Sequence, residues 1–348
     1  MDRNRPDLTG VAPDILAYIQ SLEAEIADLA EIRLQQRVDT IEDLTLDEPP
    51  SPFSLITATG SGIAKRTPVH LYARQRRGGM GVFDLDTPEE DPPVLLSIAE
   101  ESQTLLLITS ASRAFRFSLG SLSESPVHAR GSSIVSRIKL LEGESLAAVL
   151  PILAQGYLAL VSKTGMVRCL RHHVFGEYMK PGIPLYDIKS YGPLACAAWA
   201  PGDGDILIAT TQGRAIRFSE KQVPPQGCLG IRLAPEDQAI AVAPVDDDSE
   251  VFFLSADGHG TVRRMNGFAR NKTPGSGGKN AIATNHLIAA ANVDGVDDLF
   301  IISRLGKIIR FRLAEIPVKE GVVQGVICMS FRADEASALV TRRPNGLY

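Results

Sequence analysis

The chain has 348 residues, of which 44% are hydrophobic and 22% are charged, a composition typical of a folded globular protein. Its first residues are charged and polar, unlike a signal peptide, and no segment reaches the ~18 consecutive apolar residues that a membrane span needs. These features exclude a membrane partner, and we expect a cytoplasmic protein.

Charge is distributed unevenly along the chain. The net charge is −5, but residues 1–48 hold 12 Asp and Glu against 4 Lys and Arg. The remaining 300 residues carry 29 acidic and 32 basic side chains. Binding of nucleic acid depends on the surface that makes the contact rather than on total charge. The body of the protein can therefore bind DNA if its basic groups gather on one surface.

Residues 14–37 are predicted to form a helix, because Pro13 precedes a segment free of Gly and Pro. Its apolar residues step by four and three, as in a heptad seam: Ile15, Ile19, Leu22, Ile26 and Leu29. The seam is short, so self-association as a coiled coil and packing against the chain's own domain or a partner both stay open. Consecutive prolines then indicate a linker. We assign residues 1–52 to this N-terminal heptad helix and acidic linker.

From residue 53 the sequence becomes a series of short β-branched and apolar runs separated by turn residues, the pattern of an all-β domain. A strand ending in Thr or Ser, a turn, and a strand carrying Arg recur six times. We use the Thr or Ser that ends the strand before each turn as the marker of its repeat. The six markers are Thr59, Thr109, Ser162, Thr210, Ser255 and Ser303. Their spacings of 50, 53, 48, 45 and 48 residues favour six four-stranded propeller blades over a solenoid of shorter repeats.

The third residue after each marker indicates the geometry of the turn. It is Gly in five repeats and Ser112 in the other, which predicts a positive φ angle at this position. The strand that follows carries an arginine in every repeat: Arg66, Arg116, Arg168, Arg217, Arg263 and Arg310. We expect a six-bladed β-propeller over residues 53–343, followed by a tail at 344–348.

One segment of the first repeat is rich in Arg and Gly. It reads Gln75-Arg76-Arg77-Gly78-Gly79-Met80-Gly81, with Lys65-Arg66-Thr67-Pro68 upstream. Glycines let a backbone approach a ligand closely and offer N–H groups to phosphate oxygens, and arginines add forked donors. Neither feature reads base edges, so binding would be largely independent of sequence.

This segment resembles the heptapeptide of the DNA gyrase A C-terminal domain, Gln-Arg-Arg-Gly-Gly-Lys-Gly, at six of seven positions. Met80 replaces the lysine. Later repeats resemble degenerate copies of this box, at residues 226–233, 275–279 and 324–327. The resemblance extends over residues 53–343 and also to the related domain of topoisomerase IV. It implies a stand-alone β-pinwheel, a propeller in which neighbouring blades exchange strands, that wraps DNA.

The predicted DNA-binding residues include the box and basic residues of every repeat. A bend well past 90° costs on the order of 10 kcal/mol, so phosphate contacts must be spread around the ring. The predicted set is Lys65, Arg66, Arg74, Gln75, Arg76, Arg77, Gly78, Gly79, Gly81, Arg113, Arg130, Lys163, Arg171, Arg214, Lys221, Arg270, Lys272, Lys279 and Lys307.

Enzymatic activity is not expected of this chain on its own. Gyrase cleaves DNA with a tyrosine that follows an arginine, and no tyrosine here follows Arg. The sequence also lacks the phosphate-binding loop G-x-x-x-x-G-K-[ST], the zinc-protease motif H-E-x-x-H and the serine-hydrolase motif G-x-S-x-G. Cys169, His172 and His173 lack a fourth ligand for a structural zinc. We therefore expect no cofactor, no metal and no catalytic residue.

The sequence thus favours a nucleoid-associated protein that binds and wraps double-stranded DNA. It would serve a gyrase or topoisomerase IV core, as a separately encoded subunit or accessory, or act as an architectural protein. The alternative is a propeller scaffold for protein–protein interaction, with the heptad helix recruiting a partner. The acidic residues 1–48 could also compete with DNA for the basic rim.

Overall fold

The computed structural model describes residues 49–342, together with Ile15 and Ile19, which are helical. The rest of the predicted heptad helix, the acidic segment up to residue 48 and the tail lie outside the described residues. Residues 1–48 and 49–348 form two compact units, and only the second is described below. No helix within the described residues is long and apolar enough to cross a membrane.

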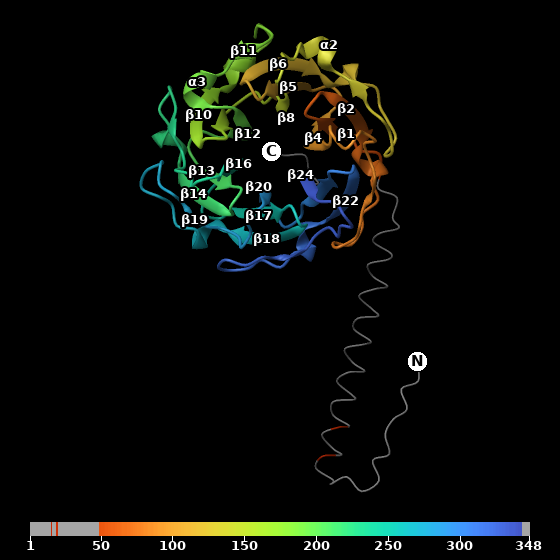
Figure 1. Cartoon of the computed structure of the whole chain (residues 1–348), viewed down its shortest axis with the longest axis vertical. Coiled ribbons are helices and arrows are strands. Elements are labelled where there is room, and N and C mark those ends of the chain that lie inside the picture. Colours follow the sequence, from red (N-terminus) through yellow and green to blue (C-terminus); the bar gives the residue numbers. More distant parts are fainter. Residues whose placement is uncertain (1–14, 16–18, 20–48, 343–348) are drawn as a thin grey trace. The chain divides into compact units, whose positions relative to one another are not determined.

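The second unit is a closed ring of six four-stranded antiparallel sheets, so the predicted six-bladed propeller is confirmed (Figure 1). The strands of each blade are numbered from the centre of the ring outwards. The first strand lies at the centre, where it contacts the first strands of both neighbouring blades. From blade 1 to blade 6, these innermost strands are β4 (Pro93–Glu100), β8 (Leu146–Pro151), β12 (Leu194–Ala200), β16 (Ala239–Val245), β20 (Leu287–Val293) and β24 (Ala336–Arg342).

The next two strands of each blade form the hairpin that the repeats predicted. The second strands are β1 (Phe53–Thr59), β5 (Thr104–Thr109), β9 (Tyr157–Ser162), β13 (Asp205–Thr210), β17 (Glu250–Ser255) and β21 (Asp298–Ser303). The third strands are β2 (Ile63–Pro68), β6 (Arg113–Ser118), β10 (Met166–Arg171), β14 (Arg214–Ser219), β18 (His259–Arg264) and β22 (Lys307–Arg312).

The turn of this hairpin has the predicted geometry in all six repeats. In the first, the N–H of Gly62 donates to the Thr59 carbonyl at 3.2 Å, and Gly62 has a φ of 92°. Ser112 adopts a φ of 58° at the equivalent position. Side chains rarely adopt this conformation, which explains why the other five repeats use glycine.

The outermost strand of each blade comes from the following repeat, which confirms the strand exchange of a β-pinwheel. From blade 1 to blade 6, these two-residue strands are β7 (Ser132–Ser133), β11 (Ile183–Pro184), β15 (Cys228–Leu229), β19 (Lys279–Asn280), β23 (Val326–Ile327) and β3 (Val82–Phe83). Strand β3 of the first repeat pairs with β22 of the sixth, matching Val82 with Ile308. This pairing closes the ring.

Short helices complete the repeats. A 3-10 helix follows each third strand: η1 (Val69–Leu71), η2 (Leu119–Ser121), η3 (His172–Phe175), η4 (Glu220–Gln222), η5 (Met265–Gly267) and η6 (Leu313–Glu315). One-turn α-helices follow two of the exchanged strands, α2 (Val135–Ile138) and α3 (Ile188–Tyr191).

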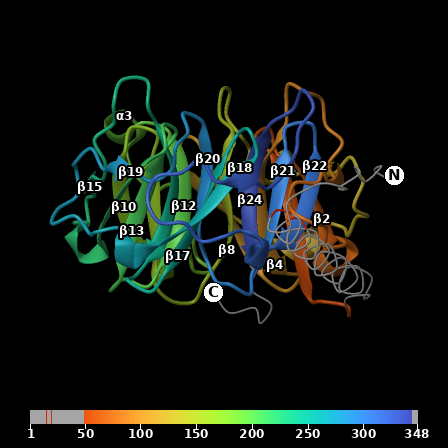
Figure 2. The same cartoon turned by 90° about the horizontal axis from the view of Figure 1, so that it is seen from below.

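The hydrophobic core lies between blades. Each of six buried clusters joins side chains from two neighbouring blades, and the cluster between blades 6 and 1 includes Leu55, Tyr72, Phe300 and Ile308. Seen edge-on, the strands run between the two flat faces of the disc (Figure 2). The exchanged strands and the connections that lead to them therefore form the outer rim.

Candidate nucleic-acid interface

The box, residues 75–81, connects η1 to the ring-closing strand β3 and lies against blades 5 and 6. The N–H of Gln75 donates to the Arg310 carbonyl of blade 6 at 2.7 Å. The N–H of Gly78 donates to the Cys328 carbonyl, which follows β23, also at 2.7 Å. Ser330 donates its N–H and its hydroxyl to the carbonyls of Gly79 and Gly78. The box is therefore a fixed loop at the junction of two blades.

The glycines of the box have a different role from the predicted one. The N–H of Gly78 is occupied by Cys328, and the N–H of Gly79 donates to the Arg76 carbonyl at 3.3 Å. These two groups are satisfied within the protein, which corrects the expectation that they bind phosphate. Gly81 has a φ of 71°, and a Cβ there would lie 2.5 Å from the Ile308 carbonyl oxygen. It lets β3 approach blade 6.

The same glycine recurs in every repeat directly before the exchanged strand. All six copies have a positive φ, between 65° and 93°: Gly81, Gly131, Gly182, Gly227, Gly278 and Gly325. At five of these positions a Cβ would come within 3.0 Å of a carbonyl oxygen of the neighbouring third strand; Gly182 faces the Arg113 side chain instead. The recurring glycine therefore lets the exchanged strand approach the third strand of the neighbouring blade.

The two arginines of the box are held differently. Arg77 donates its backbone N–H to the Glu315 carboxylate and its guanidinium to the carbonyls of Glu315 and Ile327. Arg76 is exposed, and its guanidinium has no hydrogen-bond or ion-pair partner within the described residues. Arg77 therefore anchors the loop, and Arg76 presents its donors to solvent. Met80, which replaces the family's lysine, is 46% exposed beside them.

A buried carboxylate fixes the approach to the box. Asp298 accepts hydrogen bonds from Arg310 Nε at 2.9 Å and from Arg74 Nε at 3.0 Å. Arg310 also donates to the Tyr72 carbonyl at 2.9 Å. Arg74, predicted to bind DNA, is only partly exposed and uses its guanidinium in this ion pair. Its role in the structure is to hold the start of the loop.

Lys65 and Arg66 are not on the surface, so their prediction as DNA contacts is corrected. The Lys65 side chain is fully buried, and its Nζ lies 2.7 Å from Asp84 Oδ1. Arg66 is 5% exposed and forms an ion pair with Glu101. The sequence pattern could not reveal this burial, because a lysine next to an arginine normally indicates a solvated surface.

The recurring arginine of the third strand is mainly structural. In repeats two to six its guanidinium donates to a backbone carbonyl of a connecting segment. The pairs are Arg116 with Phe175, Arg168 with Leu185, Arg217 with Met265, Arg263 with Ala281, and Arg310 with Tyr72. Charged donors make strong hydrogen bonds to such carbonyls. These arginines fasten the connections to the blades.

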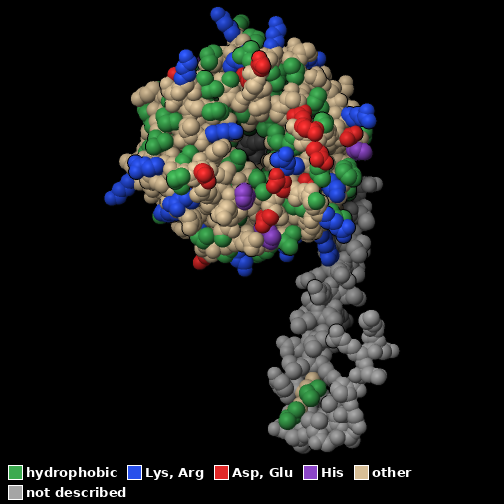
Figure 3. All heavy atoms as spheres, in the orientation of Figure 1, with side chains coloured by type: hydrophobic (Ala, Val, Ile, Leu, Met, Phe, Trp, Pro, Cys, Tyr) green, Lys and Arg blue, Asp and Glu red, His purple; other side chains and the backbone are tan. Residues whose placement is uncertain are grey.

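The structure divides the other predicted rim residues into exposed and half-buried groups. Those exposed are Arg130, Lys163, Arg171, Lys221, Arg270, Lys272 and Lys279. Among them, Arg130 forms a weak ion pair with Asp86, and Arg171 lies over the Tyr157 ring. The half-buried ones are Arg113, Arg214 and Lys307. Figure 3 shows that many Lys and Arg side chains project from the perimeter of the disc.

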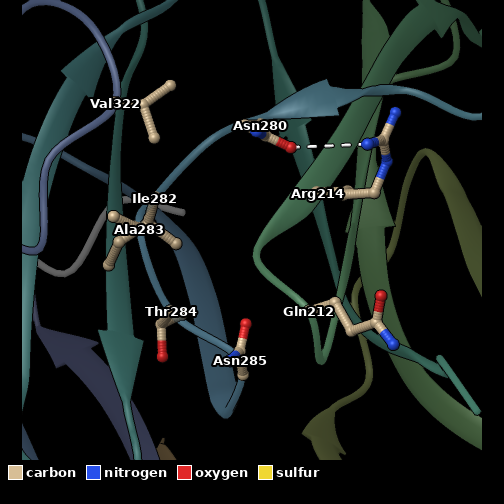
Figure 4. Close-up of a pocket in the computed structure, with 8 residues that line it drawn as sticks. All are labelled: Gln212, Arg214, Asn280, Ile282, Ala283, Thr284, Asn285 and Val322. Carbon is tan, nitrogen blue, oxygen red and sulfur yellow. Dashed lines mark hydrogen bonds between the residues drawn. The ribbon is translucent and has the colours of Figure 1, made fainter.

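Two of the half-buried arginines brace the loops around them. Arg113 donates to Glu144 at 2.9 Å, and this hydrogen bond raises the pKa of the guanidinium. Arg214 donates to the carbonyls of Gly277 and Gly278 and reaches Asn280 at the edge of an open cavity of about 460 Å³ (Figure 4). The cavity is also lined by Gln212, Ile282, Ala283, Thr284, Asn285 and Val322.

Several exposed cations were missed by the sequence reasoning. Arg137, Lys189, Arg232 and Arg332 each lie three to five residues after an exchanged strand. The signal that could have found them is the glycine before that strand, which fixes its position in each repeat.

The cysteines and histidines do not assemble into a metal site. Within the described residues, no group of three or more His, Cys, Asp or Glu side chains is placed to hold a metal ion. Cys169 packs with Cys196 and Cys228 against the core between blades 3 and 4. Burial raises the pKa of the Cys169 thiol to about 12, as expected for an unreactive thiol.

Comparison with known proteins agrees with this architecture. The sequence matches the family described as DNA gyrase C-terminal domain, beta-propeller, over residues 54–91, 103–152, 204–246 and 297–336. The gyrase A protein of Haloquadratum walsbyi is 27% identical over 98% of this chain, and that of Chlamydia muridarum is 29% identical over 85%. The chain spans about two fifths of the length of these relatives, 41% and 37% respectively.

Two solved structures share the fold. A DNA gyrase A C-terminal domain has a TM-score of 0.73 at 18% identity, with 83% of this chain and 99% of that chain covered. The C-terminal domain of DNA topoisomerase IV has a TM-score of 0.59 at 17% identity, with 84% and 94% covered. With its exchanged outer strands and its box, the chain belongs to the DNA gyrase A C-terminal domain family.

Proposed function

We propose that this domain binds double-stranded DNA along its outer rim, without reading base sequence, and bends the duplex around the ring. The observation that carries the proposal is Arg76, an exposed guanidinium without a partner among the described residues, on a loop fixed by its neighbours on both sides. A guanidinium held in this way is suited to forked hydrogen bonding with a phosphate.

The distribution of the other cations supports bending rather than a single point contact. Exposed Lys and Arg side chains project around the perimeter of the disc (Figure 3). Bending a few tens of base pairs past 90° costs on the order of 10 kcal/mol, which several separated phosphate contacts can offset. Indifference to sequence is expected because these contacts reach the backbone of the duplex.

The relatives support a role beside a topoisomerase core. The matched proteins are gyrase A proteins, and this chain spans about two fifths of their length. We propose that the domain supports a type IIA topoisomerase by presenting a curved segment of DNA, while cleavage and ATP hydrolysis belong to other parts of such an enzyme. Supercoiling by a gyrase or topoisomerase IV core lacking this domain should then change when the protein is added.

The direct test uses nicked plasmid, which is incubated with the protein, sealed with ligase and analysed for linking number. We expect a shift that grows with protein and saturates. If the plasmid is retarded in a gel but the linking number stays unchanged at saturation, the domain binds DNA without wrapping it. If the plasmid is not bound even at low salt, DNA binding itself is wrong.

A protein-interaction scaffold is the second candidate, and one observation favours it. The box and the exchanged strands β3 and β23 carry exposed apolar side chains, with exposed fractions between 45% and 56%: Met80, Val82, Phe83 and Ile327. Apolar side chains gathered on a surface can mark a protein contact. Recovery of a stable protein complex by a domain that does not retard DNA would favour this function over the first.

A further inference from the structure

The box has a structural counterpart in the fifth repeat. The loop that leads from η5 to β19, residues 268–278, makes the same backbone contacts as the loop that leads from η1 to β3. The N–H of Asn271 donates to the Arg217 carbonyl at 2.7 Å, as that of Gln75 donates to Arg310 at 2.7 Å. Each loop is therefore hydrogen-bonded near its start to the recurring arginine in the third strand of the neighbouring blade.

The equivalence continues along both loops. The N–H of Gly275 donates to the Gly230 carbonyl at 2.8 Å, in the place of the bond from Gly78 to Cys328. The N–H of Arg232 donates to the Ser276 carbonyl, in the place of the bond from Ser330 to Gly79. Both loops end in a glycine with positive φ, Gly278 and Gly81. The loop of the fifth repeat has one additional residue, so only its end, residues 275–279, resembles the box in sequence.

The same ionic anchor holds both loops. Asp205 accepts hydrogen bonds from Arg217 Nε at 2.8 Å and Arg270 Nη1 at 2.9 Å. Asp298 is bound by Arg310 and Arg74 in the corresponding arrangement. Both aspartates begin the second strand of their blade and are almost fully buried. The hydrogen bond to Asp205 raises the pKa of Arg270, which remains charged.

Each anchored arginine is followed two residues later by an exposed cation. Arg76 follows Arg74, and Lys272 follows Arg270. Neither the Arg76 guanidinium nor the Lys272 ammonium has a partner among the described residues. Lys279 adds a third charge in the fifth repeat, where its Nζ donates to the Ala269 carbonyl at 3.0 Å and stays exposed.

The backbone contacts also occur in the second repeat, where the N–H of Ser125 donates to the Arg66 carbonyl at 2.8 Å. What the other four repeats lack is the anchored arginine followed by an exposed cation. Counted from the first residue of the 3-10 helix, Arg74 and Arg270 stand at the sixth position, and Arg76 and Lys272 at the eighth. The residues at these two positions are Glu124 and Pro126, Glu177 and Met179, Pro225 and Gly227, and Val318 and Glu320. None of these eight residues is basic and three are acidic, so the pattern distinguishes two loops from the general positive charge of the rim.

We infer that residues 270–279 form a second phosphate-binding site, equivalent to the box, and that one DNA duplex occupies both. The box completes blade 6 through β3, and the second loop completes blade 4 through β19. The sites are therefore two blades, or a third of the ring, apart. A duplex fixed at two such points on a convex rim must curve between them. This inference rests on the proposed function, since it names where along the rim the duplex is held.

The test compares three variants in the nicked-plasmid assay. The first is Lys272→Ala/Lys279→Ala, the second is Arg76→Ala, and the control is Lys180→Ala/Lys319→Ala. The control removes two exposed lysines from the third and sixth repeats, whose loops lack the arginine anchor. Gel retardation of linear DNA at low salt is measured in parallel, and a thermal melt shows that each variant is folded.

The two-site arrangement predicts that the first two variants still retard DNA at low salt but lose at least half of the linking-number shift. The control loses less than a fifth of the shift, and Lys272→Arg retains it. An equal shift for Lys272→Ala/Lys279→Ala and the control overturns the second site while leaving the proposed function intact. If the unaltered protein produces no shift, the proposed wrapping fails first, and the second site fails with it.

Should the double variant melt early, Lys272→Ala alone replaces it, because the exposed Lys272 side chain makes no hydrogen bond or ion pair within the described residues. A linking-number shift for this single variant that matches the unaltered protein would also overturn the second site.

Discussion

Lys65 Nζ lies 2.7 Å from Asp84 Oδ1, and both side chains are fully buried. Lys65 belongs to β2 of blade 1, whereas Asp84 directly follows β3, the strand that completes blade 6. Tyr72 and Thr57 donate their hydroxyls to the same carboxylate at 2.6 and 2.9 Å. This buried polar cluster therefore ties the ring-closing strand to the first blade.

Replacing Lys65 by Met should destabilise the ring, because it leaves the Asp84 carboxylate buried without its counter-charge. Burial already raises the pKa of Asp84, and Lys65 opposes that rise. Removing one partner of a buried ion pair costs about 3–5 kcal/mol. Urea unfolding followed by circular dichroism measures the loss. A matched Lys65→Met/Asp84→Leu variant should recover part of it, and a loss within about 0.5 kcal/mol for Lys65→Met would contradict the role of the pair.

Gly81→Ala should weaken ring closure. The added Cβ would lie 2.5 Å from the Ile308 carbonyl oxygen at a φ of 71°, so β3 must move away from blade 6. Backbone strain and steric overlap of this kind cost about 2–4 kcal/mol. Gly267→Ala is the matched control, since nothing lies within 4 Å of its added Cβ. Equal melting temperatures for the two variants would show that β3 tolerates the displacement.

The two arginines of the box should respond differently to substitution. Arg76→Ala should leave stability unchanged and reduce the salt dependence of DNA binding by about one phosphate contact. Arg77→Ala should lower the melting temperature, because it removes the guanidinium bonds to the Glu315 and Ile327 carbonyls. Fluorescence anisotropy with labelled duplex over a salt series measures the first effect. Identical salt slopes for Arg76→Ala and the unaltered protein would remove Arg76 from the interface.

The overall architecture could be predicted because its signals are local and repeated. Six marker residues at a period near 50 defined the blades, and the residue three positions later, such as Gly62, defined the turn. The strand exchange was predicted from the resemblance of the box to the gyrase family. The repeat pattern and the box are both made of residues close together in the sequence.

What could not be predicted depends on contacts between distant segments. Lys65 looks like a surface residue until closure of the ring brings Asp84 against it. Arg270 was predicted as one surface cation among many, because its partner Asp205 lies 65 residues earlier in the chain. The glycines of the box were assigned to phosphate binding because the carbonyl that Gly81 must avoid belongs to blade 6.

Glu220 should make stability depend on pH near neutrality. Burial, with the nearby charges of Asp203 and Asp205, raises its pKa from 4.5 to about 7. Between pH 4.5 and about pH 7 the Glu220 carboxyl stays protonated in the folded state but is ionised in the unfolded state. The stabilising contribution is therefore complete below pH 4.5 and is lost as the pH rises through 7.

Glu220→Gln keeps the size of the side chain and removes its charge. This variant should exceed the unaltered protein in stability by on the order of 2 kcal/mol at pH 8 and match it near pH 4.5. Urea unfolding at several pH values measures the difference. Parallel stability curves for the two proteins across this range would show that Glu220 does not titrate as its burial predicts.

The central claim, that the rim holds and curves DNA, is tested most directly by energy transfer between dyes at the two ends of a duplex of about 60 base pairs. Free duplex of this length is nearly straight, because the persistence length is about 150 base pairs. Saturating protein should raise the transfer efficiency, and an Arg76→Ala/Lys272→Ala variant should abolish the rise. Full binding of the duplex by the unaltered protein with no change in transfer would contradict the account.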